Sequence, residues 1–328
     1  MSRRNVGFSR YFAMRVAQAI PLFFAIIIIN FVIIHFAPGD PASRLAGEFA
    51  DANYLNMIRE KFGLNKPLYE QLALYIYNVL RGDFGYSFYY EQPVIKIIES
   101  TLPNTLLLMG PSLLMASLVG LFLGVVSSRK PYSVTDNTVT VFSLVGYSLP
   151  IFWLGQVLLI AFSLDLGWFP SAGMASVRVD QVGLAYVADV VWHLFLPSVV
   201  LVVWQLALLS RLTRASMLEV FREDYIITAR AKGLPERTVI YKHALRNALL
   251  AVVTVIGVNV QYMFAGAVLT ETVFSWPGIG RLFYNAIFAR DYPLLMGMFI
   301  IISLAVIVSN LIVDLLYGYL DPRIRFTT

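Results

Sequence analysis

The chain has 328 residues, 58% of them apolar, and it contains no cysteine. Several uncharged runs are long enough to cross about 30 Å of hydrocarbon as helices, which indicates an integral membrane protein. The lack of cysteine excludes a disulfide framework, a thiolate metal site and a cysteine nucleophile. The 25 Lys and Arg residues exceed the 20 Asp and Glu residues, for a net charge of +5. In a membrane protein the placement of these charges matters more than their sum, because it sets the topology.

Six apolar runs predict an all-α membrane protein with six transmembrane helices. The runs cover residues 16–36, 106–126, 139–164, 190–210, 248–270 and 294–316. Four of them contain a proline, which removes a backbone donor, so kinks that neighbouring helices support are expected there. These prolines are Pro21, Pro111, Pro150 and Pro197. Gly120 and Gly124 form a small-residue pair that favours close helix packing.

The distribution of positive residues predicts the topology, and the apolar runs predict the divisions of the chain. Lys and Arg concentrate before the first run, at Arg129 and Lys130, in the loop 211–247 and in the C-terminal tail, so both termini are predicted to be cytoplasmic. The expected divisions are 1–36 with the first helix, 37–105 as a small extracytoplasmic subdomain, and 106–328 as a five-helix core. Within the subdomain, helices are predicted over 54–62 and 69–80.

The basic loop 211–247 predicts two helical stretches that meet at a break. Gly233 suits the left-handed position after a helix, and Pro235 suits the first position of the next one. Met217, Phe221, Tyr225 and Thr228 recur at helical spacing and predict one face of the first stretch. A solvated positive-inside loop is the simpler alternative. A nucleic-acid-binding helix-turn-helix is set aside because both ends are tied to membrane spans.

Motifs in this loop resemble those of one known family. Residues 224–247 are similar to the cytoplasmic EAA loop of binding-protein-dependent ABC importer permeases, in the form found in the dipeptide and oligopeptide branch. Gly233 stands at the family's glycine and Ala229 at the second alanine of the signature. Ile227 stands at the glutamate position and Thr228 at the first alanine; departure at the glutamate is usual for the peptide branch that this loop resembles. Further similar segments are PGDP at 38–41, GYSLPIFW at 146–153, LTETVFSWPGIG at 269–280, DLLYG at 314–318 and DPRIR at 321–325.

The resemblance is strongest to the first of the two permeases of dipeptide importers, and it implies the type I ABC importer permease fold. It further implies a heteromer in a bacterial or archaeal plasma or inner membrane. The partners would be a second homologous permease, two P-loop ATPase subunits and an extracytoplasmic binding protein. This chain would form half of a path for dipeptides or oligopeptides; nickel complexes, glutathione and haem are alternatives within the branch. ATP and Mg would be bound by the ATPases, since this chain has no Gly-Lys dipeptide and so no usual P-loop. No cofactor, metal or catalytic site is expected in it.

The resemblance assigns the coupling to the ATPases to one short segment. The expected contacts are Asp224, Tyr225, Thr228, Ala229, Arg230, Ala231, Lys232, Gly233 and Leu234. Polar and aromatic side chains within the runs are candidates for the translocation path, although ordinary interhelical hydrogen bonding is the simpler role for each one taken alone. The candidates are Tyr147, Trp153, Gln205, Asn259, Gln261 and Glu271, with Trp204 beside them.

Two other classes of function are compared with the transporter. A membrane-embedded enzyme needs a converging nucleophile and base or a carboxylate pair, but Asp165, Glu271 and Asp314 fall at different depths. A channel would not require a structured loop around Gly233. Asp314, in the last run, is expected near the cytoplasmic end, paired with a basic group, because a carboxylate at the centre of a span is costly.

Overall fold

The computed structural model describes residues 8–36, 42, 51–61, 65–87, 89–176 and 182–320. The segments 38–41 and 321–325 lie outside these residues. The chain forms two compact units, of which the first comprises residues 1–105, 264–268 and 278–328 and the second residues 106–263 and 269–277. The long helix α5 (Val94–Ser128) contributes to both.

The first unit is built around two long helices, α1 (Phe8–Phe36) and α14 (Tyr292–Leu320), which pack against each other. Its smaller elements are α3 (Ala52–Lys61), α4 (Leu68–Leu80), the antiparallel strands β1 (Tyr86–Ser87) and β2 (Gln92–Pro93), and α13 (Ile279–Phe288). Helices α3 and α4 confirm the two helices predicted in the subdomain. Asp314 lies within α14, but its side chain is outside what the structure describes.

A buried carboxylate connects the strands of the first unit to α14. Asp291 directly precedes α14 and is 4% exposed. Its side chain accepts hydrogen bonds from the Leu294 N–H at 3.1 Å and from the hydroxyl of Ser87, which is fully buried in β1. The Tyr90 N–H in turn donates to the Ser87 hydroxyl at 3.1 Å. Asp291 therefore caps α14 and holds the hairpin on it.

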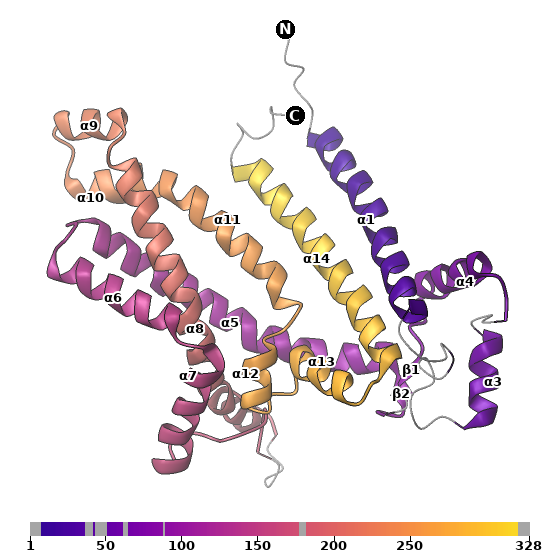
Figure 1. Cartoon of the computed structure of the whole chain (residues 1–328). Helices are drawn as coiled ribbons and strands as arrows, with labels where there is room; N and C mark the ends of the chain where they lie inside the picture. Colours follow the sequence, from indigo (N-terminus) through magenta and orange to yellow (C-terminus); the bar gives the residue numbers. More distant parts are fainter. Residues whose placement is uncertain are drawn as a thin grey trace. The chain divides into compact units, whose positions relative to one another are not determined.

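The second unit contains the rest of α5 and a set of helices that continue along the chain. They are α6 (Val134–Ser148), α7 (Ile151–Leu158), the π-helix η1 (Leu159–Asp165), α8 (Leu184–Val220), α9 (Asp224–Ala231), α10 (Glu236–Thr238), the π-helix η2 (Val239–Ala244), α11 (Leu245–Met263) and α12 (Val268–Val273). Figure 1 shows α9 and α10 where α8 ends, with α10 leading toward α11. Helix α8 packs against both α6 and α11.

Among the described residues, five helices are long and apolar enough to cross a membrane, and a sixth span results if one bent pair counts as a single span. The bent pair is α6 with α7 and η1, whose axes differ by 98°. The third predicted span, 139–164, is therefore not one continuous helix. Pro150 disfavours helical backbone in the residue before it, and Leu149 is extended at φ −71° and ψ 130°.

The fifth predicted span is also corrected, because α11 ends at Met263 rather than at residue 270. Gly266, with φ +79°, lies in the break before α12. A left-handed residue of this kind ends a helix readily when it is glycine. Apolar composition continues through the break, which is why hydropathy alone does not detect it.

The predicted close packing at Gly120 and Gly124 is confirmed. A Cβ atom at Gly124 would lie 2.4 Å from the Thr213 Cβ and 2.7 Å from the Ser210 backbone oxygen. A Cβ at Gly120 would lie 2.9 Å from the Leu209 Cβ. Helices α5 and α8 therefore approach so closely that only glycine fits between them.

Candidate functional site

The candidate site is the coupling element, defined here as residues 224–244, which comprise α9, α10, η2 and the residues that join them. A short turn after α8 leads into α9, and Asp224 places a carboxylate in the first turn of α9, where the helix dipole favours a negative charge. At the other end, the Gly233 N–H donates to the Arg230 oxygen at 2.9 Å and the Leu234 N–H to the Ala229 oxygen at 3.4 Å.

This pair of hydrogen bonds is the Schellman motif, which needs a left-handed residue at the position of Gly233. Gly233 has φ +75°, as predicted from the sequence. Pro235 is the residue that precedes α10 rather than its first residue, so the predicted start is wrong by one position. The two residues together turn the chain from α9 into α10, which runs on through η2 into α11.

The buried face of the coupling element differs from the predicted one. Tyr225 and Thr228 are exposed, whereas Ile226 and Ala229 are buried. The cause is the turn at residues 221–223, which ends α8 and restarts the helical register at Asp224. A single helical period drawn from Met217 to Thr228 is therefore right for Met217 and Phe221, which lie in or against the buried cluster, and wrong for Tyr225 and Thr228.

An apolar cluster ties the coupling element to three long helices. Ile226 and Ala229 of α9 pack with Met217 of α8, Val125 of α5 and Ala248 of α11, and η2 completes the cluster. Because interiors are close-packed, a displacement of α9 must move these helices or break the cluster. The element is thus packed firmly against these three helices.

The outward surface of α9 combines apolar and basic groups. Ile227 is 56% exposed, and Tyr225, Leu234 and Lys232 are exposed with it. The Tyr225 hydroxyl accepts a hydrogen bond of 2.6 Å from the Asn247 amide. The other predicted contacts on this surface, Asp224, Thr228, Arg230, Ala231 and Gly233, are exposed as well, whereas Ala229 faces the interior.

The exposed pair of Arg230 and Glu236 braces the element across its break. The Arg230 guanidinium lies 2.8 Å from the Glu236 carboxylate and 5.4 Å from the centre of the Phe221 ring. On the neighbouring turn, Arg129 donates to the hydroxyl of Tyr241 in η2. These contacts are solvated, so each contributes about 1 kcal/mol or less to stability.

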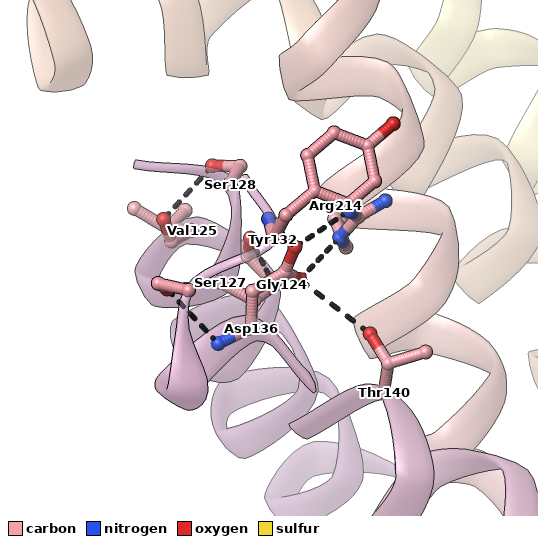
Figure 2. A network of polar contacts seen from close by, with 9 residues as sticks. Gly124, Val125, Ser127, Ser128, Tyr132, Asp136, Thr140 and Arg214 are labelled. Carbon is pink, nitrogen blue, oxygen red and sulfur yellow. Dashed lines mark hydrogen bonds and ion pairs between the residues drawn. The ribbon is translucent and has the colours of Figure 1, made fainter. Parts of the chain in front are cut away.

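A polar network that the sequence analysis did not identify lies beside the coupling element, and Figure 2 shows it. The Asp136 carboxylate, at the start of α6, accepts hydrogen bonds from Nε of Arg214 at 2.5 Å and from its terminal nitrogen at 2.7 Å. The Tyr132 N–H donates to the same carboxylate at 2.8 Å, and Thr140 lies 3.5 Å away. The Asp136 side chain is 2% exposed and the Arg214 side chain 25%.

A local sequence pattern indicates the Asp136 side of this network but not Arg214. Ser133 and Asp136 have the spacing of a helix cap, and the Ser133 hydroxyl accepts from the Asp136 N–H at 3.3 Å. Arg214 is 78 residues away from Asp136, and no local pattern relates them.

The predicted path residues are distributed over several helices of the second unit. Tyr147 of α6 stacks on Trp204 of α8 with ring centres 5.8 Å apart. Gln205 is buried and Trp153 is exposed, whereas Asn259 and Gln261 are half-buried on α11. Glu271 of α12 is fully buried. The structure brings Tyr147 and Trp204 together, and the assignment of all these residues to the path remains a prediction.

Comparisons with known proteins identify the family. Residues 116–326 match the family described as "Binding-protein-dependent transport system inner membrane component", and residues 8–109 match the N-terminal segment of such membrane components. The chain belongs to this family. The match covers more than half of the chain, including the coupling element.

Curated relatives extend the similarity over nearly the whole length. The oligopeptide transport system permease protein AppB of Bacillus subtilis is 41% identical over 317 residues, which cover 96% of this chain and 99% of AppB. The dipeptide transport system permease protein DppB of Escherichia coli K12 is 41% identical over 330 residues, with 95% and 97% covered. DppB of Haemophilus influenzae is 44% identical over 327 residues, with 95% and 98% covered.

A solved structure supports the fold. A chain of the MetNI methionine ABC transporter in an inward-facing conformation has a TM-score of 0.55 and 17% identity, and it covers 69% of this chain and 97% of its own. At this identity the likeness concerns the fold alone. The chain is thus a multi-pass membrane protein with the fold of an ABC importer permease.

Proposed function

We propose that this chain is one of two different permease subunits of an ATP-driven importer of dipeptides or oligopeptides. The observation that carries the proposal is the identity of about two residues in five to peptide permeases over almost the entire chain. The coupling element supports it, because an exposed apolar and basic surface on α9 stands on a cluster shared by α5, α8 and α11.

In the proposed mechanism, each kind of subunit has a separate task. An extracytoplasmic binding protein recognises the peptide and delivers it, and two P-loop ATPase subunits bind ATP and Mg on the cytoplasmic side. The ATPases hold α9 by Ile227, Leu234 and the basic groups near them. Their closure displaces α9, and the apolar cluster passes that displacement to the spans. Both termini of this chain are cytoplasmic in this arrangement, and the chain itself carries no catalytic role.

The path itself is assigned to polar and aromatic side chains of the second unit. Tyr147, Trp153, Asn259 and Gln261 line it in this proposal. Gln205 and Glu271 belong to the same candidate set, and both are buried. Dispersed amides and aromatic rings suit a passage that is weakly selective, because tight binding midway would slow release.

The test is to purify the chain from its native membrane with its partners and to reconstitute the complex in liposomes. We expect a second permease and P-loop ATPases to co-purify, and we expect a dipeptide with its binding protein to stimulate ATP hydrolysis and to accumulate inside. A complex whose ATPase carries a P-loop lysine substitution serves as the control. Stimulation by a nickel complex, glutathione or haem instead of peptide would contradict the proposal that peptides are the substrate. A chain that purifies alone would contradict the proposal that it is a permease subunit of an importer.

A further inference from the structure

We propose that Asp136 and Arg214 form a positioning pair that makes α6, α8 and the turn between α5 and α6 move together with the coupling element. This inference rests on the proposed function, because it concerns how the motion of α9 reaches the spans. It starts from the two charge-assisted hydrogen bonds, 2.5 Å and 2.7 Å long, that join the start of α6 to the end of α8.

The position of Arg214 on α8 places the pair next to the coupling element. Arg214 precedes the end of α8 by six residues, or about 9 Å along the helix axis. Met217, which packs under α9, follows one turn later, and Thr213, which touches Gly124 of α5, is adjacent. Successive positions on α8 therefore contact α5, α6 and α9 within about one helical turn.

The pair adds a directional restraint to the apolar packing of the helices. Apolar packing consists of many weak, non-directional contacts, so small shear movements between packed helices can exchange one set of contacts for another. A planar guanidinium that donates two parallel hydrogen bonds to one carboxylate fixes both distance and orientation. Because the Asp136 side chain is 2% exposed, water cannot easily replace Arg214 during such a movement.

The same carboxylate also holds the turn that leads into α6, as Figure 2 shows. Tyr132 has φ +62°, a left-handed conformation that is unfavourable for a bulky residue. Its N–H donates to Asp136 at 2.8 Å. One side chain thus stabilises a strained turn after α5 and binds α8, so α5 and α6 cannot hinge freely at this point.

The burial of the pair predicts an order of severity among variants. Loss of Arg214 leaves a buried carboxylate without a cation, whereas loss of the Asp136 charge leaves a guanidinium that is 25% exposed and reaches water. We expect Arg214→Gln to impair folding most and Asp136→Asn less. Arg214→Lys is the decisive variant, because lysine keeps the positive charge but cannot form the two parallel hydrogen bonds.

The experiment measures peptide imported per ATP hydrolysed by the reconstituted complex. We expect Arg214→Lys to assemble and to melt as the wild type does, while this ratio falls about fivefold. Arg211→Lys is the matched control, because Arg211 is exposed on the same helix and lies outside the coupling element. An unchanged ratio in Arg214→Lys would overturn the proposal, since a structural role in neutralising the carboxylate would then be sufficient.

A second measurement is independent of peptide import. The chain has no cysteine of its own. Cysteines introduced at two exposed positions, Thr138 of α6 and Arg222 before α9, would therefore be the only sites in this subunit that react with a thiol-specific spin label. In the complex with its ATPases, we expect the distribution of distances between the two labels to stay the same when ATP binds to the wild type. In Arg214→Lys we expect this distribution to become broader. A wild-type distance that changes with ATP overturns the inference. Absence of peptide import by the wild type contradicts the proposed function instead.

Discussion

The coupling end of the second unit and the hairpin end of the first unit are built with similar local features. Gly233 and Gly82 both have φ +75°, and a Cβ atom would meet nothing within 4 Å at either. At Gly124 and Gly297, by contrast, a Cβ would lie 2.4 Å from a neighbouring side chain. Each region thus contains one glycine required by backbone conformation and one required by close packing.

Each region also contains a buried carboxylate, and here the two differ. Asp136 faces the guanidinium of Arg214. Asp291 accepts hydrogen bonds from neutral groups, the Ser87 hydroxyl and the Leu294 N–H, and burial raises the pKa of its carboxyl above the usual value. An ion pair therefore joins two helices, α6 and α8, in the second unit, whereas hydrogen bonds from neutral groups hold a short hairpin on one helix in the first unit.

The largest loss of stability is expected from filling the two close contacts. Gly124→Val and Gly297→Val should each destabilise the protein by about 1–3 kcal/mol or prevent folding, because a backbone or packed side chain must move. Gly110→Ala is the control, since its nearest neighbour would be the Met263 Cε at 3.7 Å, an ordinary contact. Melting of the purified chain in detergent measures the effect. Equal melting temperatures for Gly124→Val and Gly110→Ala would contradict it.

Substitutions at the two left-handed glycines, Gly233 and Gly82, can distinguish a loss of stability from a loss of coupling. Gly233→Val and Gly82→Val should each cost about 1–2 kcal/mol, because a β-branched residue is forced into left-handed backbone. The change at Gly233 should also lower peptide import per ATP hydrolysed, whereas the change at Gly82 should not. Reconstituted transport of both variants tests this difference. If both lose coupling equally, or if neither does, the coupling element has no special role.

The buried carboxylate of Asp291 predicts a dependence of stability on pH. Since its pKa is raised in the folded state, its contribution is fully present below the ordinary carboxyl pKa of about 4 and is lost as the pH rises through the folded value. Asp291→Asn cannot ionise and should flatten this part of the curve. Melting temperature against pH, measured for both proteins in detergent, tests the prediction, which fails if the two curves stay parallel above pH 4.

The smallest effect is expected at the solvated ion pair of the coupling element. Glu236→Gln removes the partner of Arg230, whose side chain is 43% exposed, and should change the free energy of unfolding by about 1 kcal/mol or less. The difference should shrink further in high salt. A loss comparable to that of Arg214→Gln would show that exposure does not distinguish the two ion pairs.

Features set by short stretches of sequence could be predicted. The helices around Tyr54 and Tyr69, the helix end at Gly233 and the packing of Gly124 all follow from periodicity, turn chemistry or residue size. The role of the coupling residues and of the path residues remains a prediction, because the partners that would contact them are separate chains.

Features set by contacts between distant segments could not be predicted. The sequence indicates that Pro150 disturbs a span, but the bend of 98° depends on how α6 and α7 pack. The exposure of Tyr225 follows from a turn at residues 221–223 that no glycine or proline marks. Asp136 and Arg214 meet only because α6 and α8 pack together.

The length of α8 has a consequence for where force is applied. Its 37 residues extend about 55 Å, whereas the hydrocarbon is about 30 Å thick. Even a tilt of about 40° leaves about 15 Å of helix outside the hydrocarbon, and the charges from Arg211 onward place this excess at the coupling end. The end of α8 is therefore a stalk that keeps α9 in the aqueous phase. Membranes of different thickness would change how much of the stalk emerges, while the exposed surface of α9 stays the same.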